Sequence, residues 1–176
     1  MKLKQGYIQV YTGNGKGKTT AALGQSLRAV GNGLRVLFVQ FMKDFPYGEV
    51  NMLQQLAPHL ELKRYGNDRF VFKRQPPGAE LKKQMHDGLT ETCAAMQSQQ
   101  YDMVVLDEVL VSIYFTVLEE SAVLDCIGRK PDRVELILTG RYAPDKIIKI
   151  ADLVTNMEEI KHYYSKGVKA RQGIES

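Results

Sequence analysis

The sequence contains no tryptophan and only two cysteines, Cys93 and Cys126. These two lie far apart in helix-like segments without the spacing of a metal site, so we interpret them as buried free thiols. No stretch approaches the roughly 18 consecutive apolar residues that would span a bilayer. The two N-terminal lysines also precede no apolar run of the kind that marks a signal peptide. The sequence therefore predicts a cytoplasmic protein without a membrane partner.

A large excess of charge of one sign is also missing. The 24 basic residues stand against 20 acidic ones, which leaves a formal net charge of +4. A nucleic-acid-binding protein would concentrate its basic excess on one face or arm, so we expect no nucleic-acid partner. The densest basic cluster is C-terminal and consists of Lys161, Lys166, Lys169 and Arg171. It is either a solvated tail or a clamp on an anionic ligand, and composition leaves both interpretations open.

The chain has the size and composition of one globular domain. Its 176 residues can bury a core without help from disulfides or metals, and 44% of them are hydrophobic while 25% are charged. We find no internal repeat and no linker long enough to separate two domains. Residues 1–176 are therefore predicted to form a single domain.

Short apolar runs alternate with helix-like segments along nearly the whole chain. Strands are expected at 7–11, 34–41, 60–65, 102–106, 134–138 and 152–157, and helices at 19–30, 49–56, 79–98, before Gly128 and from Pro144. The apolar stripe of the first helix is expected to contain Ala22, Leu23, Leu27 and Val30. Residues 66–78, with glycine, asparagine and two prolines, predict a loop. The alternation predicts a three-layer α/β fold with a mostly parallel central sheet.

A glycine-rich segment, residues 12–20 (TGNGKGKTT), lies between the first expected strand and the first helix. Backbone N–H groups in such a turn, together with the positive end of a helix dipole, bind phosphates. Lys18 can reach the distal phosphates and the Thr19 hydroxyl can coordinate Mg²⁺. The usual pattern is Gly-x-x-x-x-Gly-Lys followed by Ser or Thr, and Thr12 stands where its first glycine belongs. Because residues 17–20 are intact, we still expect a nucleoside triphosphate to bind here.

Polar residues also follow two other expected strands at the point where each ends. Asp107 and Glu108 come directly after four apolar residues, and Arg141 follows the strand at 134–138. In parallel sheets, ligands lie at the carboxyl ends of the strands, so these residues are expected to share one site with the loop. The two carboxylates are predicted to bind Mg²⁺ or order water, and the alternative is that they cap the next helix. Arg141 is predicted to contact a ligand in the cleft.

Several segments together resemble the P-loop type of ATP:corrinoid adenosyltransferase, which acts on cob(I)alamin or cob(I)yrinic acid a,c-diamide. The resemblance rests on residues 12–22 (TGNGKGKTTAA), 39–43 (VQFMK), 48–49 (GE), 102–108 (DMVVLDE), 138–141 (LTGR) and 167–175 (GVKARQGIE). It covers the chain from about residue 7 to the C-terminus and implies a recombinase-like P-loop NTPase fold. Thr12 in place of glycine is itself a trait of this family.

The resemblance implies a reaction in which the 5′-deoxyadenosyl group of ATP moves to the cobalt(I) of a reduced corrinoid and triphosphate is released. The reaction serves adenosylcobalamin synthesis or corrinoid salvage. Cobalt(I) is the nucleophile, so no side chain needs to supply a nucleophile or a general base. The catalytic residues implied are Lys18, Thr19 and Glu108. Mg²⁺ would be held by Thr19 and Glu108, with Asp107 as a further candidate ligand.

The resemblance also assigns binding residues. The phosphates of ATP would be contacted by Thr12, Gly13, Asn14, Gly15, Lys16, Gly17, Lys18, Thr19 and Thr20, while Arg28 would reach the nucleoside end. Phe70-Val71-Phe72 resembles the aromatic-x-aromatic segment that displaces the lower ligand of cobalt, although some relatives have tryptophan in place of Phe72. Alternatively, both phenylalanines fill an edge of the core. A reduced flavoprotein as electron donor and a homodimer are further implications.

Some relatives cover the corrinoid with an N-terminal arm, but only about six residues precede the first expected strand here. Either the basic C-terminal tail or a partner subunit would then provide the cover, or the site is more open. Three rival functions share parts of this sequence: a P-loop ATP hydrolase or motor, a small-molecule kinase, and a nucleotide-switched binding module. For a kinase, residues 66–78 with Arg69 and Arg74 could form the lid.

Overall fold

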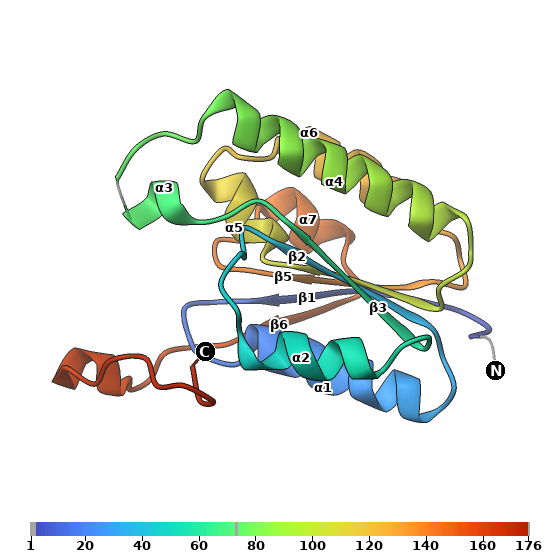
Figure 1. The fold of residues 1–176 in the computed structure, drawn as a ribbon. Helices are drawn as coiled ribbons and strands as arrows, with labels where there is room; N and C mark the ends of the chain where they lie inside the picture. The colour runs from blue at the N-terminus through green and yellow to red at the C-terminus, as the bar shows by residue number, and fades with distance from the viewer. Residues whose placement is uncertain (1–2, 73, 176) are drawn as a thin grey trace.

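The computed structural model describes the backbone of residues 3–72 and 74–175 (Figure 1). Strands and helices alternate along the chain, as the apolar pattern predicts, and the α/β fold is confirmed. The elements in order are β1 (Ile8–Thr12), α1 (Lys18–Gly31), β2 (Val36–Phe41), α2 (Gly48–Gln55), β3 (Leu60–Tyr65), α3 (Arg69–Phe72), α4 (Ala79–Gln97), β4 (Met103–Asp107), α5 (Val109–Tyr114), α6 (Glu120–Gly128), β5 (Glu135–Thr139), α7 (Asp145–Ile150), β6 (Leu153–Asn156) and the 3₁₀ helix η1 (Tyr163–Lys166).

The six strands form one sheet in the order β3-β2-β4-β5-β1-β6. Every strand pairing in it is parallel. All carboxyl ends therefore meet at one edge, where α3 and the C-terminal segment also lie in Figure 1. Because β4, β5 and β1 are direct neighbours, the chain segments that follow these three strands lie side by side.

Helices cover both faces of the sheet, which makes the fold three-layered (Figure 1). The side chains of β2 show how the two faces divide. Val36 and Phe38 pack in the cluster that includes residues of α1 and α2. Leu37, Val39 and Phe41 pack in the larger cluster, with residues of α4, α5, α6 and α7. Every residue of β2 is buried, as expected for a parallel strand with a layer on each side.

Small side chains hold α1 against the sheet. Ala22, Ser26 and Ala29 are buried, at the spacing of one helical face. Leu27, which we predicted to lie on this face, is 60% exposed, so that prediction was wrong. The helix turns its smallest residues inward, and the Ser26 hydroxyl is satisfied by donating to the Ala22 carbonyl (2.8 Å). The loop that precedes α1 is thereby brought close to the sheet edge.

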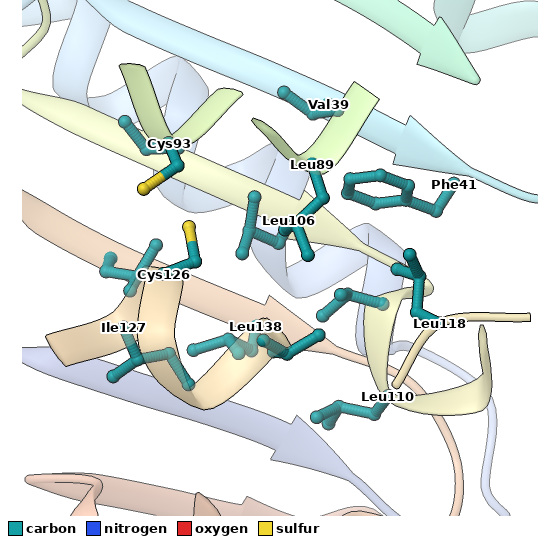
Figure 2. Close-up of a cluster of buried hydrophobic side chains, with 14 of the residues drawn as sticks. Val39, Phe41, Leu89, Cys93, Leu106, Leu110, Leu118, Cys126, Ile127 and Leu138 are labelled. Carbon is teal, nitrogen blue, oxygen red and sulfur yellow. The ribbon is translucent and has the colours of Figure 1, made fainter. Parts of the chain in front are cut away.

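The two cysteines are free and buried, as predicted. Cys93 lies on α4 and Cys126 on α6, and their sulfur atoms face each other across the core (Figure 2). Burial raises the pKa of the Cys126 thiol, and the neighbouring Cys93 raises it further. Both thiols therefore behave as core side chains.

Residues 66–78, predicted as a loop, contain the short helix α3. The Asn67 side chain accepts a hydrogen bond from the Arg69 N–H (3.1 Å), which starts the turn. Phe70 then packs into the core with 9% of its surface exposed. Local capping and one buried ring thus outweigh the loop-forming composition. No helix within the described residues is both long and apolar enough to cross a bilayer.

Candidate active site

The glycine-rich loop connects β1 to α1 at the carboxyl edge of the sheet. Gly13 (φ 97°) and Gly17 (φ 119°) adopt the left-handed backbone that favours glycine. A Cβ atom on Gly13 would lie 2.4 Å from the Met157 carbonyl oxygen. The Gly15 N–H donates to that same oxygen (2.7 Å). The segment after β6 therefore fixes the loop from outside, and this packing by itself requires glycine at position 13.

Lys18, the first residue of α1, points back across the loop. Its Nζ donates to the carbonyl oxygens of Gly13 (2.8 Å) and Gly15 (2.7 Å). Burial lowers the pKa of Lys18, and the nearby Glu108 charge partly offsets that effect. A buried ammonium group within the curve of the loop is well suited to a phosphate, which would supply the negative charge that these carbonyls lack.

Asp107, the last residue of β4, is the centre of a buried polar network. Its Oδ1 accepts hydrogen bonds from the hydroxyls of Thr19 (2.9 Å) and Thr139 (2.7 Å). Its Oδ2 pairs with the Lys43 ammonium (2.7 Å). Lys43 also donates to the Thr19 hydroxyl (3.1 Å). The carboxylate has no exposed surface and is compensated from three neighbouring segments.

Lys43 is the residue of this network that sequence reasoning missed as a site residue. It lies two residues after the end of β2, and β2 is the neighbour of β4 in the sheet. Burial lowers the pKa of Lys43, but the charges of Asp107 and Glu108 outweigh burial and raise it overall. A lysine two residues after a mostly apolar strand was the available signal.

Glu108 follows Asp107 in a left-handed backbone conformation (φ 62°). Burial and the adjacent Asp107 charge raise the pKa of Glu108, whereas Lys43, Lys18 and Arg141 oppose the increase. Glu108 occupies the N-cap of α5, but its side chain makes no capping hydrogen bond. The alternative prediction, a carboxylate pair that caps the helix, is therefore wrong for Glu108, and the carboxylate is directed to the cleft instead.

Lys18, Lys43 and Glu108 line a cleft of about 650 Å³. Its walls are formed by Asn14, Gly15, Lys16, Gly17, Lys18, Thr19, Thr20, Leu23, Lys43, Tyr47, Gly48, Glu49, Glu108, Arg141, His162, Gly173, Ile174 and Glu175. Thr12, Gly13, Asp107 and Arg28 are not among the lining residues. Thr12 lies behind the loop, where its hydroxyl accepts from the Ala143 N–H (3.4 Å). Arg28 is exposed on α1 and donates to Gln25 (3.3 Å).

The C-terminal segment folds against the glycine-rich loop. The Lys16 Nζ donates to the Ile174 carbonyl (3.0 Å) and to Glu175 (2.8 Å). Glu175 also accepts from Tyr163 and pairs with Arg171 (3.1 Å). Arg171 and Lys16 hold the pKa of the Glu175 carboxyl well below its usual range. Of the predicted basic cluster, Arg171 is therefore engaged within the protein, while Lys161, Lys166 and Lys169 remain at or near the surface.

A second hollow, of about 460 Å³, lies beside α3. Phe70 lines it and meets Phe115 edge to face, with ring centroids 5.7 Å apart. Phe70 thus fills an edge of the core, which was the alternative we left open, and it also faces the hollow. Phe72 ends α3, and its side chain lies outside the described part of the structure.

The oxygen atoms beside the loop suit Mg²⁺, which prefers hard oxygen ligands and usually takes one or two carboxylates together with substrate phosphates. Thr19, Asp107 and Glu108 supply such atoms. The Lys43 ammonium already lies between Thr19 and Asp107, so a cation occupies the place where their oxygens converge. Within the described residues, no three His, Cys, Asp or Glu side chains cluster so as to hold a metal by themselves.

A parallel α/β sheet with a glycine-rich loop at its carboxyl edge, a buried lysine in that loop and an acidic pair at the carboxyl end of β4 defines a P-loop NTPase-like fold. The profile of one family, described as ATP:corrinoid adenosyltransferase BtuR/CobO/CobP, matches residues 4–176. The chain belongs to this family, and the resemblance inferred from its motifs is confirmed.

Curated relatives agree with the family profile. The chain is 35% identical to the corrinoid adenosyltransferase CobA of Salmonella typhimurium, over 98% of this chain and 86% of that protein. It is 34% identical to the corrinoid adenosyltransferase of Escherichia coli K12, over 98% and 86%. With the corrinoid adenosyltransferase of Pseudomonas aeruginosa it shares 31% identity, over 98% and 84%. The family is therefore a family of transferases.

Proposed function

We propose that this protein transfers the 5′-deoxyadenosyl group of ATP to the cobalt of a reduced corrinoid and releases triphosphate. The observation that carries the proposal is the buried lysine and glycine loop beside an acidic pair, in a chain that matches the adenosyltransferase family along nearly its whole length. The alternative functions, ATP hydrolase and small-molecule kinase, are not favoured by this family membership.

In the proposed reaction a cobalt–carbon bond forms as the bond between the ribose 5′-carbon and the triphosphate oxygen breaks. Cobalt(I) supplies the electron pair, and the leaving triphosphate takes the pair of the broken bond. The protein must align the 5′-carbon with cobalt, which can lower the barrier by several kcal/mol. It must also stabilise the charge on the leaving group. Lys18, Lys16 and the N–H groups of the loop are proposed for that second task.

Mg²⁺ bound at this site would supply additional charge neutralisation on the triphosphate. Thr19 and Glu108 are the proposed ligands, with Asp107 as a further candidate. Asp107 is already paired with Lys43 and hydrogen-bonded to two hydroxyls. Glu108 faces the cleft, and burial raises its pKa because it disfavours the ionised carboxylate. A bound cation would stabilise that ionised form. This difference supports Glu108 as the primary carboxylate ligand.

The remaining assignments differ in their support. Arg141 lines the cleft, which supports a contact with ATP, whereas the proposed contact of Arg28 with the nucleoside rests on the resemblance alone. Phe70 and Phe72 are proposed to displace the lower ligand of cobalt. A reduced flavoprotein donor, a homodimer and a cytoplasmic location complete the proposal.

The proposed function is tested by incubating the protein with Mg·ATP and a chemically reduced corrinoid. We expect a light-sensitive adenosylated corrinoid and an equal amount of triphosphate. The Lys18→Ala variant should lose ATP binding, while Lys149→Ala, at an exposed position on α7, should behave as the wild type. Release of ADP or orthophosphate in place of triphosphate would contradict the proposal and support a kinase or a hydrolase.

A second experiment concerns the aromatic segment. Phe72→Ala should lose turnover when the corrinoid is supplied as cobalt(II) and retain most of its activity on cobalt(I). The reason is that only cobalt(II) must shed its lower ligand before reduction. Equal losses on both substrates would exclude a role in ligand displacement.

A further inference from the structure

Four aromatic rings form a continuous strip from the segment after β5 to α3. Tyr142 and Tyr114 are stacked, with centroids 4.0 Å apart and planes 27° apart. Tyr114 meets Phe115 edge to face at 5.2 Å, and Phe115 meets Phe70 in the same way at 5.7 Å. The strip therefore joins residues from α5, from the segment after β5 and from α3.

The two ends of the strip differ in exposure. Phe70 is buried, whereas Tyr114 and Tyr142 are 55% and 48% exposed although they pack on each other. Tyr142 also has a left-handed backbone (φ 61°), which is uncommon for a residue with a bulky side chain. A stacked pair that leaves this much apolar ring surface in solvent offers a flat contact area for a ligand, together with two hydroxyl groups.

The position of the pair relates it to both halves of the proposed reaction. Tyr142 directly follows Arg141, which lines the nucleotide cleft. Tyr114 lines the second hollow together with Phe70, Val71 and Pro76. Neither tyrosine lines the nucleotide cleft itself. A ligand on the pair would therefore lie beside the nucleotide and adjacent to the aromatic segment of α3.

We propose that Tyr114 and Tyr142 form a platform that supports the macrocycle of the corrinoid, a proposal that rests on the proposed adenosyltransferase function. The corrin ring is broad, flat and largely apolar, and its rim carries amide groups that can hydrogen-bond to tyrosine hydroxyls. Adenine is also flat, but ATP is proposed to bind in the cleft beside the loop, and the pair lies outside the lining of that cleft. The platform therefore determines corrinoid affinity and leaves ATP affinity unchanged.

The test compares the double variant Tyr114→Leu/Tyr142→Leu with the ring-retaining double variant Tyr114→Phe/Tyr142→Phe. Tyr7→Leu is the matched control, because Tyr7 is 52% exposed but precedes β1 at the opposite edge of the sheet. We expect the leucine pair to raise the KM for cobinamide, a corrinoid without the nucleotide tail, about tenfold. The KM for ATP should stay within about twofold, and the phenylalanine pair should retain most of the affinity.

Calorimetric titration with cobinamide measures binding without turnover. If the wild type binds cobinamide and makes no adenosylated product, the proposed function fails. The platform is then tested by the affinity of the Tyr114→Leu/Tyr142→Leu variant for cobinamide. An unchanged affinity for cobinamide would overturn the platform, and a rise only in the KM for ATP would assign the pair to adenine. A penalty seen with complete cobalamin but not with cobinamide would also overturn it, since the contact would then be to the nucleotide tail. The single variant Tyr142→Leu serves if the double variant does not fold.

Discussion

The buried Lys43–Asp107 pair provides the sharpest test of how the site is held together. Asp107→Asn keeps the shape of the side chain and an oxygen acceptor for the two threonine hydroxyls, but it removes the charge opposite Lys43. The Lys43 side chain is only 12% exposed, so its ammonium would remain buried without a countercharge. We expect the free energy of unfolding of the unliganded protein to fall.

The expected magnitude follows from the geometry. At 2.7 Å, two unit charges attract by about 6 kcal/mol at an effective dielectric constant of about 20. The cost of desolvating both groups cancels part of this attraction. Breaking such a pair from one side typically costs about 3–5 kcal/mol. Because the asparagine retains the threonine contacts, we expect a loss near the lower end, about 3 kcal/mol.

The assay is a double-mutant cycle with Lys43→Met, measured by urea unfolding followed by far-ultraviolet circular dichroism. The two changes should be coupled by about 2 kcal/mol or more, because the double variant leaves no unpaired buried charge. Lys83–Asp87 is the control, with the same residue types at 2.6 Å but side chains 71% and 59% exposed; it should show no measurable coupling. Additive effects at Lys43 and Asp107, or a coupling abolished by salt, would refute the reasoning.

Three further changes follow from other parts of the site. Gly13→Ala should cost about 3 kcal/mol of stability, because alanine disfavours the left-handed backbone and its Cβ would collide with the segment after β6; urea unfolding measures the loss. Glu108→Gln should gain stability relative to the wild type as the pH rises above 4.5. The raised pKa of Glu108 means that the folded wild type holds the proton more tightly than the unfolded chain, so its stability declines as that proton is lost; urea unfolding across this pH range measures the difference. Glu175→Gln should lower the KM for ATP roughly threefold, because Lys16 loses a competing carboxylate; initial rates at varied ATP measure it.

The first of these predictions has a matched control variant, and the other two have outcomes that would contradict them. Gly24→Ala, in the open middle of α1, should stabilise the protein by about 0.5–1 kcal/mol, since nothing lies near its added Cβ. A stability difference between Glu108→Gln and the wild type that is constant with pH would exclude the proposed titration. An unchanged or higher KM for ATP in Glu175→Gln would show that the carboxylate shapes the cleft and does not compete for Lys16.

Local sequence features predicted most of the fold. The strand–helix alternation, the loop between β1 and α1 and the acidic pair after β4 were all identified, because each depends on neighbouring residues. The errors have the same origin. Leu27 was assigned to the buried stripe of α1 because it is apolar. The face of α1 that packs on the sheet instead carries the small side chains of Ala22 and Ser26. The helix at 69–72 was missed because one buried ring, Phe70, stabilises it.

The sequence by itself determined the glycine-rich loop and the class of fold, since glycine spacing and apolar periodicity act over a few residues. Only the tertiary structure decided what surrounds the loop. Lys43 meets Asp107 across 64 positions of sequence, and Glu175 meets Lys16 across 159. Tyr114 and Tyr142 likewise come from different segments. The strand order β3-β2-β4-β5-β1-β6 creates these contacts, and no local pattern encodes which strands become neighbours.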